Sequence, residues 1–264
     1  MGKKEPAAKP FYSVLILAFV CATLVAGAAI GLRPRQEANR QLDQKKNILR
    51  AAQLYDMNKP VDDQFSVIDT KIIELVSGKF VAETHISPKS YNQLKAALSS
   101  DLGRALNKKE DIAGLRHLEK YSLVYLVKDG RKTIRVILPV RGKGLWSTMY
   151  GYVCLDGDMT TIRGISFYEH GETPGLGGEI ENKKWQTGWQ DKKMYDPSQT
   201  FALQVVKGEA SDNGENAPYQ VDGLSGATLT AGGVNNLMQF WFGKHGFKPF
   251  LDRMKTRAEM QKNG

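Results

Sequence analysis

Residues 221–234, which read VDGLSGATLTAGGV, combine glycines and small hydroxyl side chains directly before a strongly amphipathic segment. The apolar residues of that segment recur at helical spacing: Val234, Leu237, Met238, Trp241 and Phe242. This period predicts a helix over residues 234–247, with Thr230 as its N-cap. Glycines before a helix start leave backbone N–H groups accessible, which favours an anion such as a phosphate. Ser225, Gly226, Ala227 and Thr228 would line its approach.

Strand signals lie upstream of this stretch. Four segments are rich in Val, Ile, Leu and Tyr: residues 121–127, 133–140, 146–155 and 161–168. Asp129-Gly130 and Asp156-Gly157 are hairpin signals between them. The pattern predicts an antiparallel meander, followed by a short helix over residues 182–190 and a strand over residues 201–207. A run of strands with helices at its ends is typical of an α+β antiparallel sheet, which is the fold class we expect.

The N-terminal part predicts a membrane anchor. Residues 11–32 contain no charged side chain, a length that lets a helix cross a hydrocarbon core of about 30 Å. A signal peptide is the alternative, although the apolar run is longer than such peptides use. Helices are also predicted over residues 36–55, from Asp62 or Asp63 to near Gly78, and over residues 89–106. We therefore expect a tail over 1–10, a transmembrane helix over 11–32 in contact with lipid, a helical membrane-proximal region over 33–115 and a second domain over 116–264.

Charge and cysteine content exclude several classes of protein. The net charge is +9, but residues 1–50 hold nine Lys or Arg and three Asp or Glu, so the rest of the chain carries only +3. The excess flanks the apolar segment and forms no basic stripe, which argues against nucleic acid as a partner. The two cysteines, Cys21 and Cys154, allow no disulfide framework and no cysteine-based metal motif.

Three segments carry a family resemblance. They are residues 142–152 (GKGLWSTMYGY), residues 170–179 (HGETPGLGGE) and the motif that runs from Asp222 to Thr228. The last resembles the flavinylation signature Asp-Gly-x-Ser/Thr-Gly-Ala-Thr of FMN-binding domains, whose final threonine carries FMN through a phosphoester bond. The order of these segments after one membrane span resembles the C-subunit family of Na+-translocating NADH:quinone reductases. The G subunit of Rnf electron-transport complexes is the close alternative. The match is specific over roughly the second half of the chain.

The resemblance implies a membrane-anchored electron-transfer subunit with covalent FMN on Thr228. The expected flavin-binding residues are Asp222, Ser225, Gly226, Ala227, Thr228 and Thr230 in the motif, and Leu145, Trp146, Glu172, Thr173, Gly175, Leu176, Gly177 and Lys207 outside it. Because the flavin performs the redox chemistry, no catalytic side chain and no metal are expected in this chain. The implied partners are other membrane subunits of a complex that oxidises NADH and reduces ubiquinone, and a flavin transferase.

The loop over residues 172–178 suits a planar ring, because Pro174 constrains it and its glycines permit close approach. Leu145, Trp146 and Leu176 would cover the apolar end of the ring, and for Trp146 and Leu176 packing in the core is the alternative. Lys207 would pair with the phosphate or face solvent. Asp222 would cap the turn or present Thr228 to the transferase. For His170 an ordinary hydrogen bond is the expected role.

Other interpretations remain open at this stage. Residues 223–227 nearly match the G-x-S-x-G elbow of serine hydrolases, but Ala227 replaces the final glycine. A non-redox, membrane-anchored binding module would use the glycines only to turn the chain. Two arguments on the membrane topology disagree. Simple counting of the basic residues after the span places the large domain in the cytoplasm. The resemblance implies the periplasmic side of a bacterial inner membrane. We expect the periplasm, because long domains translocate largely regardless of charge.

Overall fold

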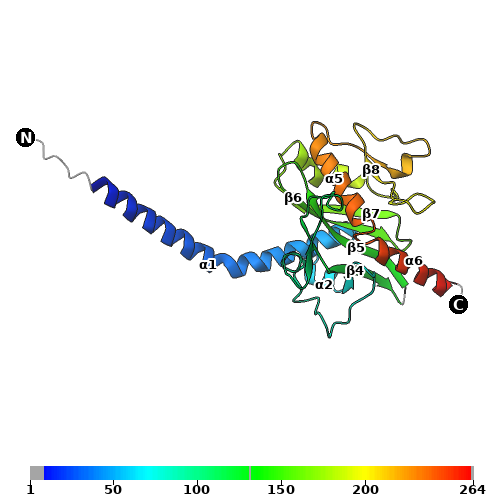
Figure 1. Cartoon of the computed structure of the whole chain (residues 1–264), viewed down its shortest axis with the longest axis horizontal. Helices are drawn as coiled ribbons and strands as arrows, with labels where there is room; N and C mark the ends of the chain where they lie inside the picture. Colours follow the sequence, from blue (N-terminus) through cyan, green and yellow to red (C-terminus); the bar gives the residue numbers. More distant parts are fainter. Residues whose placement is uncertain (1–8, 131, 263–264) are drawn as a thin grey trace, which may run out of the picture. The chain divides into compact units, whose positions relative to one another are not determined.

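The computed structural model describes residues 9–130 and 132–262 (Figure 1). Its first element is the helix α1, Lys9–Ala51, which runs without interruption through Pro34. The predicted transmembrane helix and the helix predicted after it are therefore one helix. A proline removes one backbone donor, and here that loss does not end the helix. Within the described chain α1 is the one helix that has the length and composition to cross a membrane. The chain divides into two units, one ending at Gln44 and one beginning at Lys45.

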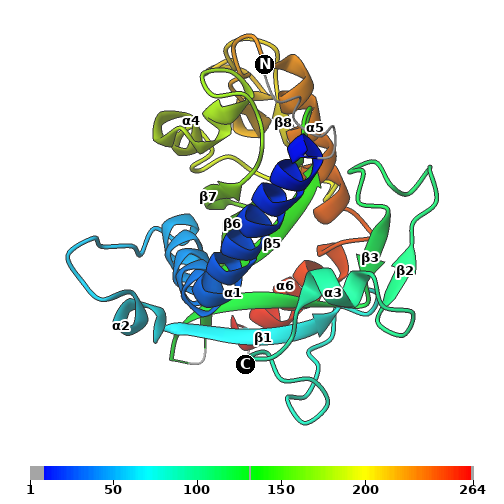
Figure 2. The ribbon, with the colours of Figure 1, turned by 90° about the vertical axis from the view of Figure 1, so that its left-hand side faces the viewer.

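The second unit is built on a five-stranded antiparallel sheet in the order β1-β4-β5-β6-β7 (Figure 2). The strands are β1 Ile68–Glu74, β4 Tyr121–Asp129, β5 Lys132–Lys143, β6 Thr148–Asp156 and β7 Ile162–Glu169. The predicted meander from β4 to β7 is confirmed, and with it the α+β fold class. The hairpin turns fall at the two Asp-Gly signals, because Gly130 follows β4 and Gly157 follows β6.

The helix predicted to end near Gly78 is wrong. The structure has only the short helix α2, Val61–Phe65, and the next residues form β1. β1 pairs with β4 from Ile68 opposite Val127 to Glu74 opposite Tyr121. Ile72 and Ile73 are both buried, at 1% and 0% exposed, because both faces of the sheet are covered. A strand buried on both faces loses the period of two that identifies strands in a sequence.

Successive residues of the central strands face two different cores. Val124 and Leu126 join a cluster with α5, Thr228–Trp241, and α6, Lys248–Lys262. Tyr125 and Val127 join a second cluster with Ile48 and Leu49 at the end of α1. This alternation is the period of two that a strand requires. The sheet is therefore covered on both faces, and α5 is fixed along its buried side.

Short elements complete the second unit and correct three further expectations. They are α3 Gln93–Ala97, β2 Gly103–Ala105, β3 His117–Glu119, η1 Gly177–Glu181, α4 Lys183–Thr187, β8 Gln204–Val205, η2 Ala217–Tyr219 and β9 Gln220–Val221. The helix predicted over 89–106 shrinks to α3, and the strand over 201–207 shrinks to β8. The helix predicted over 182–190 is present as α4. The helix predicted over 234–247 begins earlier, at Thr228, and ends at Trp241.

Arg141 joins β5 to β3 through a buried ion pair and to the last turn of α5 through its backbone carbonyl. Arg141 donates to both carboxylate oxygens of Glu119, at 2.9 and 2.6 Å, and the two residues are 8% and 1% exposed. The Trp241 indole N–H donates to the Arg141 carbonyl at 2.7 Å. Since a buried charge needs a partner, the ion pair fixes β3 against β5, and the Trp241 hydrogen bond fixes the C-terminal turn of α5 to β5. The N-terminal turn, which carries the motif, is fixed separately.

Candidate functional site

The motif forms an exposed helix start. Thr228 is the first residue of α5 and is exposed, while Ala227 before it is 7% exposed. No described side chain caps this helix, and the first backbone bond into it runs from the Ala231 N–H to the Ala227 carbonyl. The N–H groups of the first turn therefore have no helical acceptor, and the helix dipole is positive here. Gly226 has φ of +68°, a conformation that glycine adopts without strain.

Thr230 is not the N-cap that the sequence predicted. Its side chain is 1% exposed, and its hydroxyl donates to Glu172 Oε2 at 2.6 Å. The hydroxyl is therefore bonded to a residue that is distant in the chain, and Thr230 itself is the third residue of α5. Thr230 is two positions after Thr228, on the buried side of α5, whereas Thr228 is on the exposed side. Of the two threonines, only Thr228 offers its hydroxyl to solvent.

Glu172 joins three segments of the site. Its carboxylate accepts the Thr230 hydroxyl and the backbone N–H groups of Leu145, Trp146 and Ser147, the last three at 3.2, 3.0 and 3.2 Å. The residue is 4% exposed. Burial alone would raise the pKa of this carboxyl, but the Thr230 hydroxyl and the three N–H groups outweigh it and hold the pKa below its ordinary value. Glu172 is therefore an anion that fixes the β5–β6 turn to the start of α5.

The loop that follows Glu172 is compact. The Thr173 carbonyl accepts the N–H groups of Leu176 and Gly178, at 3.1 and 2.9 Å. Gly175 has φ of +76° and lies in open space, so it is the loop position that needs glycine for its conformation. Gly177 is different, because a Cβ there would lie 2.5 Å from Thr230 Oγ1. The sequence predicted that the flavin ring would approach the backbone of Gly177. In the structure the close neighbours of Gly177 are instead the bonded side chains of Glu172 and Thr230.

Four large apolar side chains surround the helix start and remain exposed. Leu145, Trp146, Leu176 and Leu229 are 43%, 66%, 44% and 67% exposed. Leu176 lies so close to Gly226 that a Cβ there would be 2.9 Å from its Cδ2. None of the four is a core residue, which was the alternative for Trp146 and Leu176. Sequence reasoning missed Leu229, although its place next to Thr228 was a usable signal.

Asp222 and Lys207 lie at the start of the motif. Asp222 Oδ1 accepts the Ala210 N–H at 2.7 Å, and the Asp222 carbonyl accepts the Trp185 indole N–H at 2.8 Å. Asp222 therefore fixes the loop before the motif, and not the turn that follows it. A Cβ at Gly223 would meet the Val206 carbonyl and the Gly208 N–H, which flank the exposed Lys207. Ser225 and Gly226 are exposed on the same turn.

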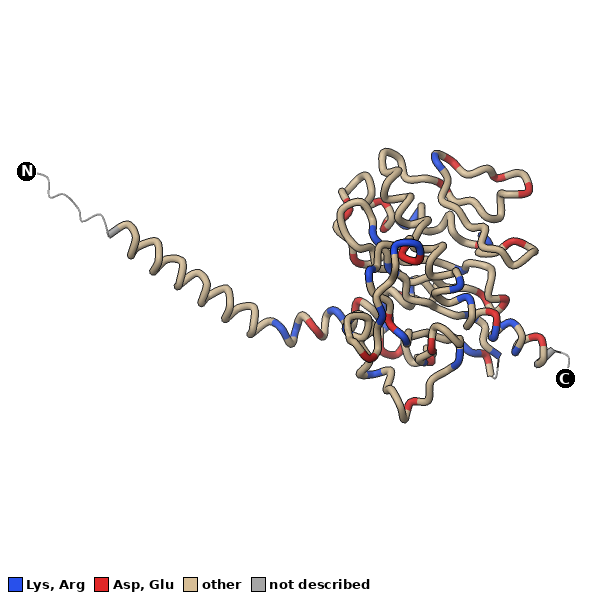
Figure 3. Tube along the Cα trace, viewed as in Figure 1, with Lys and Arg blue, Asp and Glu red and all other residues tan. Residues whose placement is uncertain are grey.

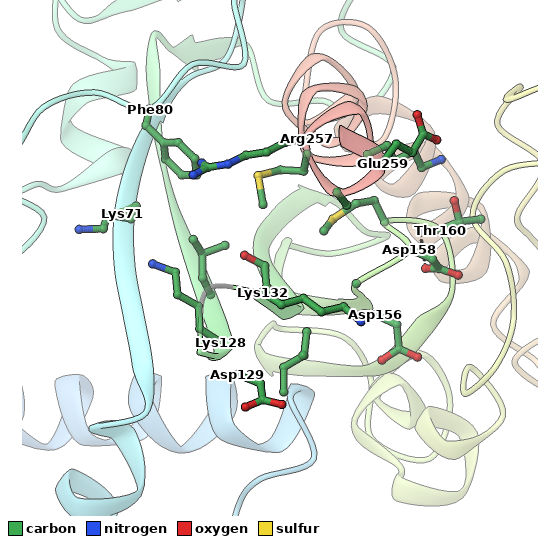
Figure 4. Close-up of a pocket in the computed structure, with 18 of the residues that line it drawn as sticks. Lys71, Phe80, Lys128, Asp129, Lys132, Asp156, Asp158, Thr160, Arg257 and Glu259 are labelled. Atoms are coloured by element: carbon green, nitrogen blue, oxygen red, sulfur yellow. Dashed lines mark hydrogen bonds between the residues drawn. The ribbon is translucent and has the colours of Figure 1, made fainter. Parts of the chain in front are cut away.

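A cavity of about 1670 Å³ lies elsewhere in the second unit (Figure 4). Lys71, Lys128, Asp156 and Arg257 are among the residues that line it, and they come from the sheet and from α6. None of the predicted flavin-binding residues lines it. The start of α5 is the candidate site, because it unites an exposed hydroxyl, a helix start without a side-chain cap and exposed apolar side chains. Within residues 9–130 and 132–262, no group of three or more His, Cys, Asp or Glu could hold a metal ion.

Comparison with known proteins points to one family. Residues 144–243 match the FMN-binding domain family. The C subunit of the Na(+)-translocating NADH-quinone reductase of Pseudomonas aeruginosa is 44% identical over 97% of this chain and 98% of its own length. The corresponding C subunit of Yersinia pestis is 42% identical over 97% of this chain and 95% of its own length.

Solved structures give the same result. The crystal structure of Shewanella oneidensis NqrC superposes with a TM-score of 0.74 at 33% identity, covering 83% of this chain and 99% of that one. The matches extend well before the three segments that carried the resemblance, into the region around β1. Agreement in sequence over nearly the whole length and in fold over most of it leaves one assignment: the chain belongs to the C-subunit family of Na(+)-translocating NADH-quinone reductases.

Proposed function

We propose that this chain is the electron-transfer subunit of a Na+-translocating NADH:quinone reductase and carries FMN on Thr228 through a phosphoester bond. The observation that supports this most is the position of Thr228, an exposed hydroxyl at the first residue of an uncapped helix inside the matched FMN-binding domain. A phosphate attached there would meet unpaired N–H groups and the positive end of the helix dipole. Bound FMN supplies the electron-carrying chemistry, and the protein positions it.

The exposed apolar side chains fit the ring of the same cofactor. Leu145 and Trp146 follow β5, Leu176 lies in the loop after Glu172, and Leu229 follows Thr228. In this proposal they cover the apolar part of the isoalloxazine, while backbone groups of the loop meet its polar edge. Thr173, Gly175 and Gly177 shape that loop. Lys207 faces the phosphate side, and Asp222 fixes the loop before the turn on which Ser225, Gly226 and Ala227 lie.

The experiment that tests the proposal detects a covalent flavin. We expect the purified chain to remain fluorescent after denaturation and gel electrophoresis, and mass spectrometry of its peptides to find FMN on the peptide that contains Thr228. A noncovalent flavin would leave the chain on denaturation, and a module without redox function would bind none. Absence of both the fluorescence and the FMN adduct would overturn the proposal.

We also propose that α1 anchors the chain in the bacterial inner membrane, with the second unit on the periplasmic side. The charge-free length of α1 supports the anchor (Figure 3). The topology implies that a separate flavin transferase attaches FMN outside the cytoplasm and that the other membrane subunits of the complex are neighbours of α1.

The topology predicts opposite results for two fusions at the C-terminus. Alkaline phosphatase needs the periplasm to fold, so a fusion after the last residue is expected to be active. A GFP fusion at the same point is expected to be dark if it is exported unfolded. An inactive phosphatase together with a fluorescent GFP would contradict the periplasmic placement.

A further inference from the structure

His170 is a titratable side chain beside the site that the proposed function does not use. It follows the last residue of β7 and precedes the glycine-rich loop. Its side chain is only 9% exposed, and its Nε2 is buried without a hydrogen bond. An imidazole so enclosed next to Glu172 needs an explanation, since buried polar atoms are normally paired.

The two ring nitrogens of His170 face the two sides of the loop: Nδ1 faces its first residue, Glu172, and Nε2 faces Glu181 in η1, just after it. Nδ1 accepts the backbone N–H of Glu172 at 3.1 Å. Nε2 lies 3.1 Å from Glu181 Oε1, although the pair lacks the geometry of a hydrogen bond. Because Nδ1 uses its lone pair as an acceptor, a neutral ring carries its proton on Nε2, the nitrogen beside Glu181. The charged group beside the ring is the Glu181 carboxylate, whereas Glu172 meets the ring through its backbone N–H.

The same ring lies close to the far side of the loop. The ring lies near Gly178, because a Cβ added at that glycine would come within 3.7 Å of His170 Cε1. The N–H of Gly178 donates to the Thr173 carbonyl, so the ring packs where the loop closes on itself. His170 therefore bonds to the start of the loop, at Glu172, and lies beside its closure, at Gly178.

We propose that His170 is a positioning residue for the flavin. Its Nδ1 fixes the backbone of Glu172, and the Glu172 carboxylate in turn holds the β5–β6 turn and Thr230 on α5. The three segments are thereby held in one arrangement, and the flavin ring contacts side chains from each of them. This inference rests on the proposed function, because it assigns the loop to the flavin; the hydrogen bond itself belongs to the protein alone.

Two substitutions of His170 distinguish the roles of its two ring nitrogens. In His170→Asn the amide oxygen takes the place of Nδ1 and keeps an acceptor for Glu172. In His170→Gln the amide takes the place of Nε2, so the acceptor for Glu172 is lost. Hydrogen exchange of the peptide over residues 171–178 is measured in the full-length chain in detergent. We expect exchange in His170→Asn to match the parent, and exchange in His170→Gln to accelerate roughly fivefold, the size of one net hydrogen bond.

The flavin itself gives the second readout. Fluorescence anisotropy and midpoint potential are expected to be unchanged in His170→Asn and shifted in His170→Gln, with FMN still attached to Thr228 in both. The matched controls are His85→Asn and His85→Gln, at an exposed histidine, which should change neither readout. If His170→Asn and His170→Gln exchange alike, the positioning role is wrong. If the parent carries no FMN, the proposed function fails and the flavin role of His170 fails with it, whereas the exchange data still report on the loop.

Discussion

Replacing Thr228 with valine is expected to abolish covalent flavin completely while the fold is kept. Valine has the shape of threonine but lacks the hydroxyl oxygen that must bridge to the phosphate. Thr228 is exposed, and substitutions at exposed positions usually change the free energy of unfolding by less than about 0.5 kcal/mol. Peptide mass spectrometry measures the FMN adduct, and the thermal midpoint and circular dichroism report the fold.

The matched control for this prediction is Thr256→Val, the same substitution at an exposed threonine of α6 outside the motif, which should retain full flavinylation. Thr230 is a poor control, because its hydroxyl is buried and bound to Glu172. The assignment would be contradicted by an adduct that persists in Thr228→Val, or by one found on Ser225 or Thr230 in the parent chain.

Among the substitutions described, removal of the Glu172 carboxylate is expected to lower the free energy of unfolding most. Glu172→Ala leaves three backbone N–H groups and the Thr230 hydroxyl without their acceptor in a buried site. Loss of a buried, hydrogen-bonded charge typically costs about 3–5 kcal/mol. For a domain of this size that corresponds to a drop of about 10 °C in the thermal midpoint. Glu209→Ala, at an exposed carboxylate, serves as control and should change the midpoint little.

The same carboxylate makes stability depend on pH in a defined direction. Because the pKa of Glu172 is lower in the folded chain than its ordinary value, its contribution is fully present above the pKa of an unfolded glutamate. The contribution is lost as pH falls through the lower folded value. Glu172→Gln keeps the size of the side chain but cannot ionise, so this part of the pH dependence should vanish. A pH profile of the thermal midpoint that is identical in the parent and in Glu172→Gln would show that the carboxylate is not the anchor.

The structure also changes the roles that we infer for Glu172 and Gly177. Both were predicted to contact the flavin directly, from the clustering of polar residues and glycines. In the structure Glu172 is buried and Gly177 packs against Thr230, so both act within the protein and support the surface that a cofactor would meet. The better exposed candidates are instead Leu145, Trp146 and Leu176.

Sequence alone determined the features that depend on neighbours in the chain. The strands on either side of Asp129-Gly130 and Asp156-Gly157 were predictable, because hairpins pair adjacent segments. The apolar stripe of α5 was predictable, because helical neighbours are only three or four residues apart. The motif that ends at Thr228 was readable, because it is a short contiguous signature.

Tertiary structure alone decided the features that depend on distant partners. β1 is a strand because β4, about fifty residues later in the chain, offers it a pairing edge. The helix start shifted from Thr230 to Thr228 because Glu172, 58 residues before Thr230, takes the Thr230 hydroxyl. Such contacts follow no local period, since burial and hydrogen-bond partners are fixed only when the chain has folded. The sequence thus predicted which threonine would carry the flavin, and packing decided that its hydroxyl, and not that of Thr230, faces solvent.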